Sequence, residues 1–100
     1  MIYLLYVYQY SFTGDYYEAL LVVLDKIGND WSKLVTFLDA TIDIAVVRNQ
    51  NPNSVFDQGR EALKEWSQKH PTDVTVANLE RGLKAIGRND IIIAIKESNQ

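Results

Sequence analysis

Few residues in this chain have the types and spacing that covalent chemistry would need. His70 is the only histidine, and there are no cysteines among the 100 residues. This composition excludes thiolate nucleophiles, disulfides and multi-histidine metal centres. No serine or carboxylate stands at a recognisable catalytic spacing from His70, and there is no glycine-rich phosphate loop. The sequence therefore predicts a protein that is not an enzyme and that holds no cofactor or metal.

With covalent chemistry excluded, the charged side chains could still bind another macromolecule non-covalently. The chain has 13 acidic and 10 basic residues, a net charge of −3 and a pI near 5.0. Nucleic-acid binding favours a basic patch and a high pI, so this balance argues against it. It also argues against a polybasic membrane anchor. The lack of cysteine favours a reducing, intracellular location.

The beginning of the chain differs from the rest. Residues 1–14 carry no charged side chain, and every charge lies from Asp15 onward. This tyrosine-rich segment is shorter than the about 20 apolar residues that cross a bilayer, so we expect no membrane insertion. Its aromatic and β-branched residues favour an extended, non-helical or loosely attached flank. The flank either packs on the domain or forms an exposed arm that binds a partner, and residues 15–100 form one domain.

Apolar residues recur at helical spacing after Asp15 and predict six short helices. Residues that stop helices should end three of them, at Gly28, Pro71 and Gly87. Side chains that accept a hydrogen bond from a helix N-terminus should cap others: Asp30, Thr41, Thr75, and Asn89 or Asp90. The longest helix should run from about Ser54 to His70. The core anchors should be Trp31, Leu34, Leu63, Trp66, Leu79, Leu83 and Ile91. Short loops between six helices predict an all-α antiparallel bundle.

Three motifs appear in a characteristic order along this helical region. The segment at 29–35 (NDWSKLV) resembles the start of the second helix of a death domain. The segment at 51–66, with its Asn-Pro-Asn turn and Ala-Leu-Lys-Glu-Trp ending, resembles the turn and fourth helix. The segment at 75–92 resembles the fifth and sixth helices. The pattern is similar to ankyrin-type and receptor-type death domains, although the tyrosine-rich flank has no counterpart in it.

The resemblance implies a six-helix Greek-key death fold and a protein–protein interaction module rather than an enzyme. Such modules work in cytoplasmic signalling proteins, including adaptors of apoptosis and innate immunity. The implied partners are other death domains, bound homotypically or heterotypically, and the chain could form a homo-oligomer. Three asymmetric surface pairs are implied. They join helices one and four to helices two and three, the end of helix four to the helix five–six corner, and helix three to nearby loops.

Charged residues on these surfaces are the candidate contact residues, because charge complementarity sets the choice of partner. Asp15 and Glu18 on the first helix could form an acidic face together with the acids of the fourth helix. His70 lies beside Lys69 at the end of the fourth helix. The candidates are Asp57, Arg60, Glu61 and Lys64 on the fourth helix, Lys33 and Arg48 on the second and third, Lys69 at the end of the fourth, and Arg88, Asn89 and Asp90 at the helix five–six corner.

Each candidate also has a purely structural interpretation. Charges on the fourth helix can be a solvated face, Lys69 and His70 can complement the helix dipole, and Asp90 can be an N-cap. The leading hypothesis is homotypic assembly of signalling complexes. The alternative is a terminal structural domain of an ankyrin-like scaffold with an intramolecular or non-death-domain partner. A helix-turn-helix nucleic-acid binder is disfavoured by the acidic balance, and an enzyme is less favoured still.

Overall fold

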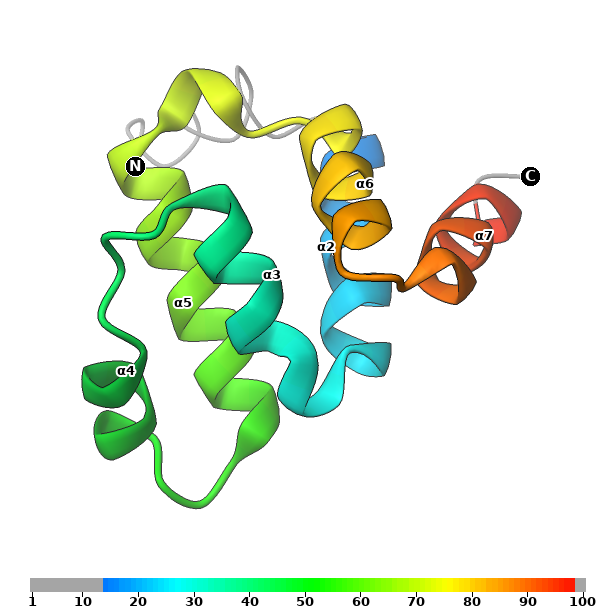
Figure 1. Cartoon of the computed structure of the whole chain (residues 1–100). Coiled ribbons are helices and arrows are strands. Elements are labelled where there is room, and N and C mark those ends of the chain that lie inside the picture. Colours follow the sequence, from blue (N-terminus) through cyan, green and yellow to red (C-terminus); the bar gives the residue numbers. More distant parts are fainter. Residues whose placement is uncertain (1–13, 99–100) are drawn as a thin grey trace.

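The computed structural model describes residues 14–98, which are entirely helical apart from turns and short connections (Figure 1). Within this range the chain forms an antiparallel bundle of six α-helices, as the sequence predicts. They are α2 (Gly14–Lys26), α3 (Trp31–Leu38), α4 (Ile44–Gln50), α5 (Val55–Lys69), α6 (Val76–Ala85) and α7 (Asn89–Ser98). Two short 3₁₀ turns, η1 (Gly28–Asp30) and η2 (Pro71–Asp73), precede α3 and α6. The predicted flank lies outside the described residues except for Gly14, which begins α2.

Several helix ends follow from the local sequence. Ser54 accepts the Asp57 amide at 3.0 Å and caps α5, while Thr75 accepts the Asn78 amide at 3.1 Å and caps α6. Gly28 and Gly87 have φ values of +53° and +79°, the left-handed conformation that glycine adopts without strain. Helix α5 ends at Lys69, and Pro71 then begins η2. The predicted cap at Thr75 and the predicted helix ends are therefore confirmed.

Two predicted caps are wrong because the side chains have other partners. Helix α4 is capped by Asp43, which accepts the Val46 amide at 3.1 Å. Thr41 lies outside that helix and donates its hydroxyl to Asp39 at 2.6 Å. Asp30 makes no capping bond, because η1 leads directly into α3 and the Asp30 carboxylate binds Arg88 in the connection between α6 and α7.

The predicted cap of α7 is also wrong. Asn89 and Asp90 are the first two residues of the helix itself. The Asp90 carboxylate accepts hydrogen bonds mainly from Arg88, while the backbone amides of Asp90 and Ile91 lower its pKa to a smaller extent. A local sequence pattern for capping cannot reveal this choice, because it depends on where the preceding side chain points.

The core forms around α3, which packs against both α5 and α6, while α2 packs on α7. Gly82 lets α6 approach α3 closely, since a Cβ atom there would lie 2.6 Å from Leu34 Cδ1. Gly59 does the same for α5, where an added Cβ would lie 3.3 Å from Trp31 Cβ. All the predicted anchors are at most 2% exposed: Trp31, Leu34, Leu63, Trp66, Leu79, Leu83 and Ile91.

One buried polar residue ties α5 to α3 and to the turn before α5. Gln58 accepts the indole N–H of Trp31 at 3.1 Å and donates its amide to the Asn51 carbonyl at 2.9 Å. The Asn51 side chain in turn donates to the Val47 carbonyl at 3.1 Å. A buried amide is stable only when its hydrogen bonds are satisfied. These bonds therefore fix the Asn-Pro-Asn turn between α4 and α5.

Candidate protein interaction surfaces

The charged side of α5 is partly neutralised within the helix. Arg60 Nη2 lies 3.3 Å from Asp57 Oδ1, and Lys69 Nζ lies 3.5 Å from Glu65 Oε2. These pairs offset the repulsion between acids spaced four residues apart. Among residues 14–98, neither Glu61 nor Lys64 has an ion pair. They are the α5 charges that remain open to a partner.

Exposed apolar side chains accompany these charges, and the sequence patterns did not identify Phe56 among them. Phe56 is 47% exposed and Val55 37% exposed at the start of α5. They line a hollow of about 220 Å³ between the ends of α2 and α5, together with Leu24, Asp25, Ile27, Gly28 and Gly59. Phe56 lies off the helical positions that form the core, and that phase was the available sequence signal. Exposed apolar side chains close to charges are typical of protein-binding surfaces.

The basic candidates lie on α3 and α4. Lys33 has a side chain that is 69% exposed, with its Nζ 3.6 Å from Asp30 Oδ1. The Arg48 guanidinium lies 5.4 Å from the centre of the Trp31 ring, a cation–π distance. Arg48 also donates to the Ser32 hydroxyl at 3.4 Å. The fold therefore places Arg48 against Ser32, which is the neighbour of Lys33 in the chain. We call Lys33, Ser32 and Arg48 the basic face.

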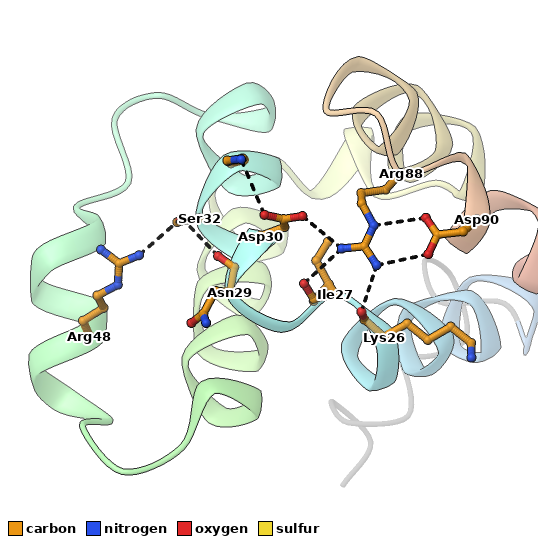
Figure 2. Close-up of polar contacts among 9 residues, drawn as sticks. Lys26, Ile27, Asn29, Asp30, Ser32, Arg48, Arg88 and Asp90 are labelled. Atoms are coloured by element: carbon orange, nitrogen blue, oxygen red, sulfur yellow. Dashed lines mark hydrogen bonds and ion pairs between the residues drawn. The ribbon is translucent and has the colours of Figure 1, made fainter.

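The corner between α6 and α7 is organised around Arg88, whose side chain is turned inward (Figure 2). Arg88 pairs with both oxygens of Asp90 at 3.0 and 3.1 Å and with Asp30 at 3.0 Å. Asp90, more than Asp30, raises the pKa of the Arg88 guanidinium, and Arg88 lowers the pKa of Asp90. Of the three corner candidates, Asn89 and Asp90 are exposed and Arg88 is only 23% exposed. Their contact with a partner stays a prediction.

The end of α5 is tied to the end of α3. His70 Nε2 lies 2.8 Å from Asp39 Oδ2, and His70 Nδ1 lies 3.8 Å from Asp73 Oδ2. The hydroxyl and amide of Thr41, followed by His70, lower the pKa of Asp39 to about 2. His70 therefore joins two helix ends, which neither predicted role of this residue anticipated. No group of three or more metal-ligating side chains occurs among the described residues.

The part of the chain that the structure describes also contains no helix that is long and apolar enough to cross a membrane. The arrangement resolves into two groups of charges on different helices. One lies on α2 and α5, where acidic side chains stand beside Arg60, Lys64 and the exposed apolar groups, and the other is the basic face of α3 and α4. Figure 1 places α2 and α4 on either side of α5, and both helices contact it.

Comparison with known proteins identifies the architecture. The family model described as Death domain matches residues 17–98. The chain belongs to the death-domain family. Members of this family are protein-interaction folds of signalling proteins rather than enzymes, and the match confirms the expected six-helix Greek-key bundle.

Individual relatives of this death domain fall into two groups. Human ankyrin-3 is 31% identical over 78 residues, covering 77% of this chain and 2% of ankyrin-3. Mouse ankyrin-1 is 28% identical over 82 residues, covering 81% of this chain and 4% of ankyrin-1. The human FAS-associated death domain protein is 28% identical over 89 residues, covering 86% of this chain and 42% of that protein. The chain thus spans less than half the length of each of these relatives.

Proposed function

We propose that this death domain assembles signalling complexes through homotypic contacts with other death domains. The observation that carries the proposal is the placement of open charges on different helices of one small bundle. Glu61, Lys64 and exposed apolar side chains lie on α5, acidic residues lie on α2, and two cations lie on α3 and α4. Acidic groups such as Glu61 of one domain complement the basic face of another, and such complementarity directs association and the choice of partner.

The proposed contact joins two different surfaces, so each bound domain leaves one of each type free. Contacts of this heterologous kind close into rings or grow into helical arrays. Exposed charges are screened by salt over a Debye length of roughly 8 Å at physiological ionic strength. Assembly should therefore weaken as salt is added. The apolar side chains around Phe56 provide contact area that salt does not screen.

The similarity to the FAS-associated death domain protein favours a role in apoptotic signalling, with a cytoplasmic location and an adaptor function. In this proposal the chain works by binding alone and catalyses no reaction. Its partners are death domains, its own copies included, and neither nucleic acid nor a membrane is a partner.

The ankyrin matches favour a second candidate. In it, this death domain is one small part of a long scaffold and contacts another surface of that scaffold or a partner without a death domain. The two candidates differ in what the isolated chain does at high concentration. Homotypic assembly requires self-association or binding to another death domain, whereas the scaffold role predicts a monomer.

Sedimentation velocity of the full 100-residue chain at low and high salt tests the proposal. Lys33→Glu should weaken association severalfold because it reverses a charge on the basic face. Lys96→Glu is the matched control. Lys96 is 65% exposed and lies 3.7 Å from Glu80, much as Lys33 lies beside Asp30, but it belongs to α7. Equal effects of the two variants, or a strict monomer at all concentrations, would reject homotypic assembly through the basic face.

A further inference from the structure

The guanidinium of Arg88 joins the start of α7 to the turn between α2 and α3 (Figure 2). Its Nη2 donates to the Lys26 carbonyl at 3.1 Å, and its Nη1 donates to the Ile27 carbonyl at 3.3 Å and to Asp30 at 3.0 Å. Carbonyls at the end of a helix lack the partners that they would have inside it. Arg88 supplies those partners from a position about 60 residues further along the chain.

Asp30 is shared between two cations on opposite sides. Its Oδ2 accepts from Arg88 at 3.0 Å, and its Oδ1 lies 3.6 Å from the ammonium group of Lys33. The backbone amide of Asp30 also donates to the Ile27 carbonyl at 3.1 Å. Arg88 therefore holds both the carboxylate that pairs with Lys33 and the backbone turn that leads into α3, the helix that carries Lys33.

The same turn reaches the second cation of the basic face. The Asn29 carbonyl accepts the Ser32 hydroxyl at 3.4 Å, and Ser32 accepts Arg48 at the same distance (Figure 2). One set of polar contacts thus runs from Arg48 on α4 to the Asn29 carbonyl in η1, and a second set runs from Asp30 to Arg88 beside α7. The peptide bond between Asn29 and Asp30 joins the two sets. The corner and the basic face are parts of one connected structure.

We propose that Arg88 is a positioning residue for the basic face, because it clamps the α2–α3 turn and thereby fixes the placement of Lys33. The proposal rests on the function proposed above and deepens it. Arg88 acts through Asp30 and two carbonyls, and it does not itself contact the partner. The planar guanidinium can donate to carboxylates and carbonyls in several directions at once, which the single ammonium group of lysine cannot reproduce.

The first test measures amide hydrogen exchange at Asp30 in the full chain. Arg88→Lys keeps the charge but loses the planar guanidinium that donates in several directions. Arg60→Lys is the matched control, because among the described residues Arg60 pairs only with Asp57 on its own helix. Urea unfolding of each variant gives the global stability against which exchange is corrected. We expect Asp30 exchange to rise about tenfold beyond the global change in Arg88→Lys and not in Arg60→Lys. Equal exchange in both variants overturns the clamp.

The second test asks whether the clamp acts through Lys33. Self-association is measured for Arg88→Lys, Lys33→Gln and the double variant, with Lys96→Gln as control. If Arg88 acts by positioning Lys33, Arg88→Lys should weaken the association of the wild-type chain severalfold. The same change should weaken the association of the Lys33→Gln variant little further, because both changes remove one interaction. Fully additive effects overturn positioning. A wild-type chain that never associates rejects the proposed function instead, and hydrogen exchange still decides whether the clamp exists.

Discussion

At the scale of single residues, the polar groups that matter are those whose partners lie far away in the sequence. Asp39 accepts the hydroxyl and amide of nearby Thr41 but also meets His70 from the end of α5, and its side chain is only 6% exposed. Hydrogen bonds to a carboxylate favour its charged form. This carboxylate therefore makes folding sensitive to acid.

The pH dependence of Asp39 has a definite sign. Its pKa is about 2 in the folded chain, against 3.8 for the unfolded group. The stability it contributes is fully present above about pH 4 and is lost as the pH falls toward 2. Asp39→Asn should remove about 1–2 kcal/mol of that acid dependence, a figure reduced from the full shift because solvent screens the partner His70, which is 40% exposed. Urea unfolding between pH 2 and pH 5 measures it.

Asp73→Asn is the matched control for that experiment. Asp73 also faces His70, at 3.8 Å, but its side chain is 57% exposed. An acid dependence that Asp73→Asn flattens as much as Asp39→Asn would mean that the hydrogen bonds from Thr41 to Asp39 have no special effect.

Gln58 gives the second prediction at this scale. Gln58→Ala removes the partners of the Trp31 indole N–H and of the Asn51 carbonyl, and it opens space in the core. Leaving a buried polar group unsatisfied costs about 1–3 kcal/mol. The free energy of unfolding in urea should fall by about that amount or more. Gln68→Ala, on the exposed part of the same helix, should change it by less than about 0.5 kcal/mol.

At the scale of helices, local sequence predicts ends well where the capping partner is also local. Thr75 and Gly87 act where their patterns place them. Asp30 fails as a cap because Arg88, 58 residues away in sequence, binds its carboxylate. The helices and their buried faces could therefore be predicted from periodicity, whereas the inward turn of Arg88 could not, because the side-chain partner depends on how the helices pack.

The cap at Thr75 is testable by substitution. Thr75→Ala removes the bond to the Asn78 amide and should lower the free energy of unfolding by about 1 kcal/mol. Thr72→Ala is the control, since Thr72 is exposed within η2. Equal losses of stability in urea for the two variants would show that the loss comes from the threonine side chain in general rather than from the cap.

At the scale of the whole molecule, the candidate surfaces combine charges that the sequence displays with apolar groups that its patterns left aside. The sequence identified Lys33 and Arg48 as cations on successive helices, and the fold places Arg48 against Ser32, the chain neighbour of Lys33. It did not identify Phe56, because a single apolar residue outside the core pattern is common on protein surfaces. Only the hollow between α2 and α5 shows that Phe56 has apolar neighbours there.

Phe56 should therefore contribute the part of assembly that salt does not remove. Phe56→Ser should weaken self-association by about tenfold, equivalent to about 1.4 kcal/mol, with little change in stability because the ring is already 47% exposed. Ile93→Ser is the control, since Ile93 is 55% exposed on α7, away from both candidate surfaces. Sedimentation at low and high salt separates the contributions. In Phe56→Ser the association remaining at high salt should vanish, whereas Lys33→Glu should lower mainly the low-salt component. If Ile93→Ser weakens assembly as much as Phe56→Ser, the apolar contact lies elsewhere or is nonspecific.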